Sequence, residues 1–355
     1  MRTIPRWTLA APFVGWLLLG GVALGWGGAY LALVGAALLA CVLAGVHHAE
    51  VVAHRVGEPY GTLILAVVIT VIEVALIVTL MLAGGPAATA LARDTVFAAV
   101  MVILNGMVGL CLLVGATRHG EQEFALQGTS AALTTLAAIA VLALVLPNYT
   151  ETTPGPFYSR SQLGFIAVVS LVLYGTFVLV QAVRHRHHFL PVNAPEETDA
   201  PRPTARAALA SGAVMAVSLL VVVLSAKALA PAVEQVVAAA GAPQATVGVV
   251  IAIVVLMPEG LAALRAARDN RLQTSLNLAL GSALASIGLS IPTVALLSIA
   301  TGWTLTLGLD AKGTALLVLS LFTAALSLGT GRTTVMQGTV HLVIFAVYLF
   351  LTVVP

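Results

Sequence analysis

The chain has 355 residues, of which 60% are hydrophobic and only 8% are charged. Soluble chains of ordinary composition carry about 25% charged residues, so a soluble enzyme is excluded. The formal net charge is only +2, and no basic block of the kind that binds nucleic acid is present. The cysteines, Cys41 and Cys111, stand far apart in apolar runs, which excludes a disulfide framework and a CxxC motif. We therefore expect an all-α polytopic membrane protein without a resident cofactor.

Apolar runs of spanning length recur along the chain. A membrane-spanning helix needs about 20 mostly apolar residues. Eleven such runs cover residues 7–26, 29–47, 59–83, 93–117, 127–146, 162–183, 208–230, 243–264, 273–299, 313–329 and 335–354. Glycine and proline separate them, as in Gly84-Gly85-Pro86 and Pro154-Gly155-Pro156. The runs are continuous rather than alternating, which argues against a transmembrane barrel, so we predict about 11 transmembrane helices.

The positive residues predict the orientation, because Lys and Arg collect in cytoplasmic loops. A cytoplasmic N-terminus places twelve arginines on that side: Arg2, Arg6, Arg55, Arg118, Arg184, Arg186, Arg202, Arg206, Arg265, Arg268, Arg271 and Arg332. The other side receives Arg93, Arg160 and Lys312, with Lys227 near a helix end. Arg2 and Arg6 before an apolar stretch also suit a signal peptide, but the stretch exceeds a usual signal core. We expect an uncleaved first helix, a multi-pass protein of the bacterial inner membrane, and a periplasmic or extracellular C-terminus.

A polar segment at 184–206 contains four prolines and charges of both signs, which is typical of a linker. It separates six spans from five. If the first span, in residues 1–27, is set aside, residues 28–183 and 207–355 each hold five. An odd number of spans per half reverses the orientation of the second half. The sequence therefore predicts two inverted five-helix repeats, the architecture of many secondary transporters.

Two glutamates lie inside apolar spans. Glu73 lies fourteen residues after Pro59 and eleven before Gly84, which places it near the bilayer centre at about 1.5 Å per residue. Glu259 lies in the second span of the second half, where it corresponds to Glu73. A carboxylate at the centre of a spanning helix costs about 2.5–3.5 kcal/mol on insertion scales. Such residues therefore need a partner or a function.

Two facing carboxylates resist joint ionisation unless a cation lies between them. Competition between protons and a metal ion for such a pair is the chemistry of a cation/proton exchanger. Ca²⁺ takes six to eight oxygen ligands. Polar side chains that could add ligands are Thr70, Asn105, Ser282 and Ser286. The alternative is that the glutamates are protonated packing residues and that the other four are ordinary helix-packing groups.

Two segments resemble a known family. They are HHAEVVAHRVGEPYGTLILAVVITVIEVALI at 47–77 and PEGLAALRAARDNRLQTSLNLALGSALASIGLSIP at 258–292. Both are similar to the Ca²⁺/H⁺ antiporters of the cation/Ca²⁺ exchanger superfamily, and more closely to the bacterial ChaA type, described as calcium or sodium/proton antiporters. In that family each repeat carries a Gly-Asn-x-x-Glu motif whose glutamate binds the ion and the exchanged protons. The resemblance implies this role for Glu73 and Glu259.

The chain departs from the family pattern at several oxygen ligands. The Gly-Asn pair is replaced by Ile69-Thr70 in the first repeat and by Val255-Leu256 in the second. Gly281-Ser282 keeps the Gly-Ser segment of the second repeat, but the glutamine usual three residues later is Ala285. In the first repeat Val100-Met101 stands in place of Gly-Ser. Fewer oxygens leave Na⁺ and K⁺ as alternatives to Ca²⁺.

Several polar residues near helix ends allow two interpretations each. Glu50 and Glu234 could lead cations or protons toward the two sides of the site, or could belong to ordinary amphipathic helix ends. The histidines His185, His187 and His188, beside two arginines, could bind a metal, although such a run more often anchors a cytoplasmic segment.

The leading hypothesis is a secondary antiporter, not an enzyme, that exports Ca²⁺ from the cytoplasm in exchange for H⁺. Na⁺/H⁺ or K⁺/H⁺ exchange at the same residues is the alternative. The sequence has no Walker A motif for ATP-driven transport. An intramembrane enzyme would need a nucleophile with a base or an HExxH motif, yet His341 has no evident partner in the sequence. A cation channel shares an acidic lining but needs no proton coupling.

Overall fold

The computed structural model describes residues 5–57, 60–84, 89–190 and 203–354. Ten described helices are long and apolar enough to cross a membrane, and α3 contributes the shorter apolar segment Val67–Leu82. This result confirms the predicted polytopic all-α class. The middle of the predicted linker, residues 191–202, and the break at Gly85-Pro86 lie outside the described residues.

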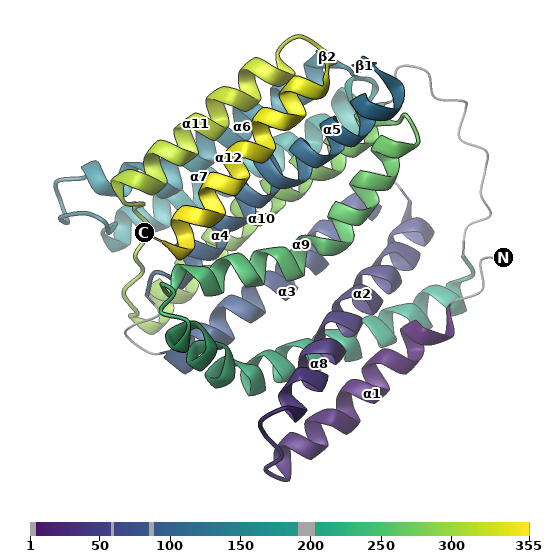
Figure 1. Cartoon of the computed structure of the whole chain (residues 1–355), viewed down its shortest axis with the longest axis vertical. Coiled ribbons are helices and arrows are strands. Elements are labelled where there is room, and N and C mark those ends of the chain that lie inside the picture. Colours follow the sequence, from purple (N-terminus) through teal and green to yellow (C-terminus); the bar gives the residue numbers. More distant parts are fainter. Residues whose placement is uncertain (1–4, 58–59, 85–88, 191–202, 355) are drawn as a thin grey trace. The chain divides into compact units, whose positions relative to one another are not determined.

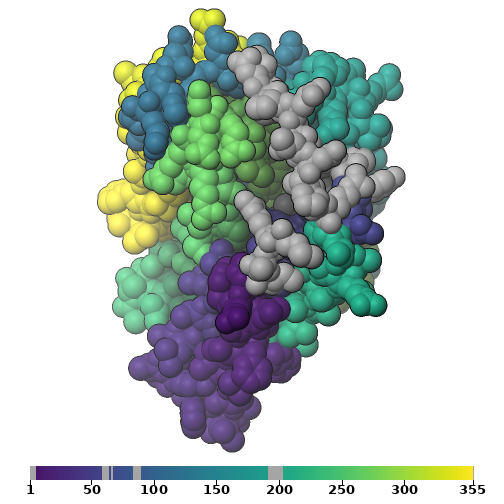
Figure 2. All heavy atoms as spheres, turned by 90° about the vertical axis from the view of Figure 1, so that its right-hand side faces the viewer, coloured from purple at the N-terminus to yellow at the C-terminus, as the bar shows by residue number. Residues whose placement is uncertain are grey.

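The contacts divide the chain into two compact units that do not follow sequence order. Unit 1 contains residues 1–88 and 196–241. Its helices are α1 (Arg6–Ala23), α2 (Tyr30–Val56), α3 (Tyr60–Gly84) and α8 (Ala205–Ala239). In this unit α2 packs against α1, α3 and α8, as Figure 1 shows for α1, α2 and α8. Large apolar side chains of α1 are exposed, and this helix, purple in Figure 2, lies at the surface.

Unit 2 contains residues 89–195 and 242–355. Its longer helices are α4 (Leu91–Met101), α5 (Val108–His119), α6 (Leu126–Leu144), α7 (Arg160–Leu179), α9 (Ala245–Arg268), α10 (Leu272–Thr301), α11 (Ala311–Leu328) and α12 (Val335–Val353). A π-helical segment, η2 (Val102–Met107), joins α4 and α5 into one continuous span, and a second, η4 (Val180–Arg184), extends α7. Short 3₁₀ turns, η3 (Leu146–Tyr149) and η5 (Arg186–Phe189), follow α6 and η4.

Two helices extend past the ends that hydropathy predicts. The second run was expected to end at residue 47, but α2 continues to Val56 and stops before Gly57, whose φ is 80°. The seventh was expected to end at residue 230, but α8 continues through Pro231 to Ala239. Hydropathy marks the lipid-facing length, whereas a helix continues into its polar end while its backbone can still hydrogen-bond. Gly57 ends α2, because residues other than glycine rarely adopt its positive φ.

Unit 2 contains two antiparallel strand pairings, each between a loop of the first half and a loop of the second. The two pairings use corresponding loops, with the halves interchanged. Strand β1 (Gln122–Glu123) pairs antiparallel with β2 (Arg332–Thr333). Near the other end of α6, Phe157 forms an antiparallel bridge with Thr306. In the first pairing the loop between the third and fourth spans of the first half meets the loop between the fourth and fifth of the second. In the other pairing the halves have swapped roles.

The helix contacts between the two halves show the same correspondence. The third span of the second half, α10, packs against the fifth of the first half, α7, while α5 packs against α12. This is the arrangement that inverted five-span repeats produce. The boundaries 1–27, 28–183, 184–206 and 207–355 remain a prediction, since the compact units combine helices of both halves.

Glycines bring the backbones of α5 and α12 together. A Cβ atom at Gly338 would lie 2.5 Å from the backbone nitrogen of Leu113, and one at Gly109 would lie 2.8 Å from Cβ of His341. Such small residues let spanning helices approach closely where lipid offers no hydrophobic driving force.

We expect Gly338→Ala to destabilise the protein by about 1–3 kcal/mol, because the added methyl group overpacks a backbone contact. Gly175→Ala in α7 is the matched control, since a Cβ there meets no atom within 4 Å. That change should be neutral or stabilising, because alanine favours helix by up to about 1 kcal/mol. Thermal unfolding of both variants in detergent measures the difference. Equal midpoints would contradict the close packing of α5 on α12.

Candidate ion-binding site

Glu73 lies on the buried face of α3 within unit 1. Its side chain is only 3% exposed, and Thr70, one turn earlier, is also buried. On the opposite face of α3, the apolar side chains of Val67 and Val71 are exposed at the surface of the protein. The i, i+3 spacing places the Thr70 hydroxyl on the same face as the Glu73 carboxylate. Unit 1 thus holds one buried carboxylate with a neighbouring oxygen.

Glu259 lies on the buried face of α9 within unit 2, where it is 7% exposed. Pro258, inside the helix, has no N–H to donate to the carbonyl of Val254 one turn earlier. Gly260 allows close packing, because a Cβ there would lie 3.4 Å from Cε of Met107. Pro258 thus leaves the Val254 carbonyl oxygen without its helical hydrogen bond. Gly260 allows the π segment η2 to pack closely against α9.

The segment η2 carries Asn105 and packs against both α9 and α10. π-Helical insertions are rare and occur frequently at functional sites. Ser282 and Ser286 lie one turn apart on α10. Unit 2 therefore brings four of the predicted residues onto three mutually packed helices, with Glu259 on α9, Asn105 on η2 and the two serines on α10.

The amide of Asn105 is hydrogen-bonded at both ends. Its Nδ2 donates to Oγ of Ser320 at 2.8 Å, and its Oδ1 lies 3.3 Å from Nδ1 of His341. Nε2 of His341 lies 2.8 Å from Oγ of Ser327. With Nδ1 carrying the proton, neutral His341 donates to Asn105 and accepts from Ser327. We call Asn105, Ser320, Ser327 and His341 the buried polar network.

The buried polar network joins η2 to α11 and α12, and all four of its side chains are buried. The Asn105 Oδ1 atom accepts one hydrogen bond, so its second lone pair is the only one left for an ion. Sequence reasoning missed this network, because residues more than 200 positions apart make its bonds to Asn105. The one indication of this network in the sequence was His341, a single histidine within an apolar run.

The hydroxyl of Ser282, unlike the amide of Asn105, makes no hydrogen bond to the described residues. Its Oγ is also buried. A buried hydroxyl without a partner is unfavourable, so Ser282 offers an oxygen that an ion could use. Ser286 is buried on the same helix face.

The two predicted pathway residues lie nearer helix ends in unit 1. Glu50, in the last two turns of α2, is exposed and lies 3.9 Å from Nδ1 of His47. Glu234 is partly buried in the last turns of α8. The structure thus places both acids away from the middle of their helices, in positions compatible with ion entry and with ordinary helix ends.

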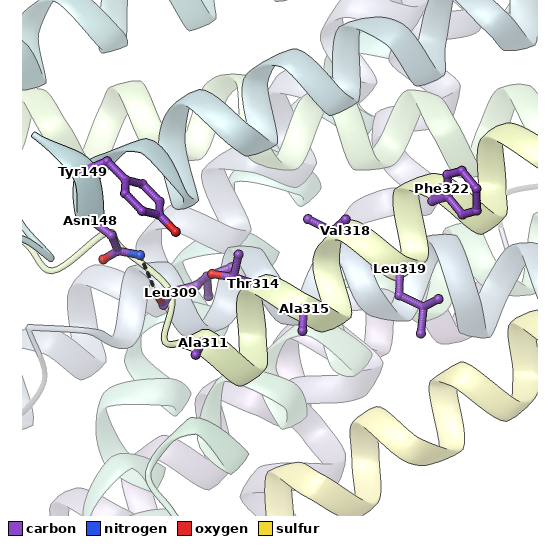
Figure 3. A pocket seen from close by; sticks show the side chains of 9 residues that line it. All are labelled: Asn148, Tyr149, Leu309, Ala311, Thr314, Ala315, Val318, Leu319 and Phe322. Carbon is purple, nitrogen blue, oxygen red and sulfur yellow. Dashed lines mark hydrogen bonds between the residues drawn. The ribbon is translucent and has the colours of Figure 1, made fainter.

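A cavity outside the candidate site lies along α11. It measures about 760 Å³ and is lined by Asn148, Tyr149, Leu309, Ala311, Thr314, Ala315, Val318, Leu319 and Phe322 (Figure 3). Phe322 is 62% exposed and Val318 53%. In a membrane protein such an apolar outer groove suits a lipid chain rather than an ion.

A smaller cavity of about 290 Å³ carries charge, and sequence reasoning did not single it out. Arg93, Asp94, Asp310 and Lys312 line it beside Ala245, the first residue of α9. Arg93 contacts Asp94 at 2.8 Å and donates to the carbonyl of Gly308 at 3.0 Å. Glu259 is about 21 Å further along α9 at 1.5 Å per residue, so these charges belong to the helix ends.

Comparison with known proteins identifies the family. The model of the sodium/calcium exchanger protein family matches residues 24–183 and 210–354. The chain belongs to this family. The two matched segments lie on either side of the predicted linker, and both buried glutamates fall inside them.

Two curated relatives cover most of this exchanger. The y4hA protein of Sinorhizobium fredii is 51% identical over 90% of this chain and 87% of its own. The sodium-potassium/proton antiporter ChaA of Escherichia coli is 36% identical over the same shares. These matches confirm the resemblance inferred from the two glutamate segments.

Solved structures share the fold of this exchanger. YfkE superposes with a TM-score of 0.74 at 18% identity, covering 99% of this chain and all of that one. The H⁺/Ca²⁺ exchanger CAX gives a TM-score of 0.73 at 14% identity, covering 98% and 89%. At these identities the likeness concerns the fold alone.

A double-mutant cycle tests the buried polar network. Asn105→Ala and His341→Ala should each lower the free energy of unfolding, because each leaves a buried partner without its hydrogen bond. The two changes should be coupled by about 0.6 to 1.7 kcal/mol, which are the mean and the largest value found for hydrogen bonds between spanning helices. Thermal or denaturant unfolding of the wild type, both single variants and the double variant measures this energy. Simple additivity would contradict the contact.

Proposed function

We propose that the chain is a cation/proton antiporter in which cation and protons compete for the carboxylates of Glu73 and Glu259. The observation that carries the proposal is the burial of both side chains in spanning helices of an exchanger, at 3% and 7% exposure. A carboxylate within a membrane is costly unless it serves transport or has a partner. A carboxylate that binds either a proton or a cation has its negative charge neutralised in both states, which removes most of this cost.

The proton gradient sets the direction of transport, and the arginines indicate which end of the chain faces the cytoplasm. Twelve arginines on one side favour a cytoplasmic N-terminus and a periplasmic or extracellular C-terminus. In the bacterial inner membrane, inward proton movement would then drive cation export from the cytoplasm. The family consists of transporters, and no catalytic step is needed for this reaction.

Ca²⁺ is the first candidate for the transported cation. Two carboxylates neutralise a divalent ion, and Thr70, Ser282 and Ser286 could add oxygen ligands of the kind that Ca²⁺ prefers. CAX, whose solved structure shares this fold, is named an H⁺/Ca²⁺ exchanger, which supports this choice at the level of the fold.

Na⁺ or K⁺ is the second candidate, and a specific observation favours it. The Asn105 Oδ1 atom already accepts from His341, and the family's Gly-Asn pairs are missing next to both glutamates. Fewer oxygen donors around the ion favour a lower ion charge. The 36% identical relative from Escherichia coli is named a sodium-potassium/proton antiporter.

We expect Glu73→Gln and Glu259→Gln each to abolish cation-dependent proton movement in proteoliposomes, because an amide cannot exchange a proton for a cation. Glu123→Gln is the matched control. Its carboxylate is 60% exposed and pairs with Arg332 at the surface, so transport should persist. Wild-type exchange by either of the first two variants would refute the site assignment.

The pH dependence of transport should reveal the charge of the cation. Because protons compete with the cation, apparent cation affinity should rise with pH, by up to about tenfold per pH unit for each proton displaced. A divalent ion that displaces two protons should therefore show a steeper rise than Na⁺ or K⁺. Apparent affinities for Ca²⁺, Na⁺ and K⁺ measured separately between about pH 6 and 9 test this expectation. An affinity independent of pH would show that protons and cation do not share these residues.

A further inference from the structure

Three histidines meet in the turn that follows α7. His185, His187 and His188 each offer a ring nitrogen, and these three atoms lie within 4.8 Å of one another. The rings of His187 and His188 are 4.2 Å apart between centroids, and those of His185 and His188 are stacked at 5.2 Å. His187 is exposed, while the other two are partly buried. Within the described residues no hydrogen bond to these imidazole rings competes for the nitrogens.

The turn itself is held firmly on unit 2. Phe189 is buried and packs edge-to-face against Phe177 of α7 at 5.9 Å. The amide of Asn277 in α10 donates to the carbonyl of Phe189 and accepts from Gln273 at 2.9 Å. In α6, Gly128 leaves room for the turn, because a Cβ there would lie 2.5 Å from the carbonyl oxygen of His188. Three helices therefore fix the backbone that carries the histidines, which reduces the ordering entropy lost on binding a ligand.

The donor set suits a transition metal rather than the transported cations. Neutral imidazole suits Zn²⁺, Ni²⁺ and Cu²⁺, whereas Ca²⁺, Na⁺ and K⁺ prefer oxygen ligands. Zinc bonds to histidine at about 2.0–2.1 Å, so a tetrahedral ion would draw the three nitrogens to roughly 3.4 Å apart. The three nitrogens, which lie within 4.8 Å of one another, would have to move closer by about 1.4 Å at most to reach that separation.

Two arginines lie among the three histidines in the sequence. Arg184 and Arg186 oppose a cation through their charge, which limits the affinity without removing the ligands.

We propose that His185, His187 and His188 form a binding site for one divalent transition-metal ion of the zinc type, with water completing the coordination. The orientation proposed above puts this site on the cytoplasmic face, at the start of the linker between the two halves. It shares no residue with the proposed glutamate site and differs from it in ligand chemistry. Binding here does not depend on the transport activity, so either proposal can fail while the other stands.

Zinc titration of the full-length protein in detergent tests the site, with any affinity tag removed because a histidine tag would itself bind zinc. Competition with a chromophoric chelator measures affinity and stoichiometry. Loss of even an outer-shell partner costs metal sites about 10- to 100-fold, so His187→Ala and His188→Ala should each weaken zinc binding by at least about tenfold. His54→Ala, an exposed histidine in α2, is the matched control and should leave the affinity unchanged.

Substitution with Co²⁺ supplies a readout that nonspecific binding would not reproduce. Wild-type protein should show the visible absorption of a tetrahedral nitrogen-coordinated ion, and His187→Ala should lose it. Calcium in excess should displace neither metal. The proposal is overturned if zinc binds with equal affinity to the wild type and the His187→Ala/His188→Ala double variant, or if no binding occurs.

Discussion

The energetic constraint on this exchanger is that hydrocarbon offers no hydrogen bonds to polar groups. Each backbone N–H and C=O must be satisfied within its own helix, which is why nearly the whole described chain is helical. Each buried polar side chain must also find a partner or serve a function. Asn105 and His341 meet this demand through one another and through two serines. Glu73 and Glu259 meet it, in our proposal, through the ions that they carry.

The same constraint explains how helices associate in unit 2. Lipid chains are as apolar as leucine, so burial of apolar surface gives little driving force between spanning helices. Close backbone approach at Gly109 and Gly338 and the hydrogen bonds of Asn105 supply specific contacts between the third span of one half and the fifth span of the other. The equivalent pair, α10 and α7, meets at Gly288, where a Cβ would lie 2.9 Å from Cβ of Tyr174. Small residues thus hold corresponding pairs together in both halves.

In our proposal, cation choice depends on how many oxygen atoms remain available beside Glu73 and Glu259. The sequence has apolar residues and threonine in place of the family's Gly-Asn pairs, which removes potential ligands. In the structure, the hydrogen bond from His341 occupies one of the two lone pairs of the Asn105 Oδ1 atom. Pro258 acts in the opposite direction, since it leaves the Val254 carbonyl without a helical donor. We expect the balance between these effects to separate a divalent from a monovalent exchanger, because the fold by itself does not specify the cation.

The sequence by itself determined the membrane class, the number of spans and the two carboxylates, because each depends on local hydropathy or on a single costly charge. The family segments around Glu73 and Glu259 were likewise readable along the chain. Helix ends were less predictable, since α2 and α8 run beyond their apolar lengths. Only the tertiary structure decided which side chains meet. Asn105 bonds to Ser320 and His341, and Phe189 holds three histidines in one turn, because contacts between distant spans depend on packing that no local pattern records.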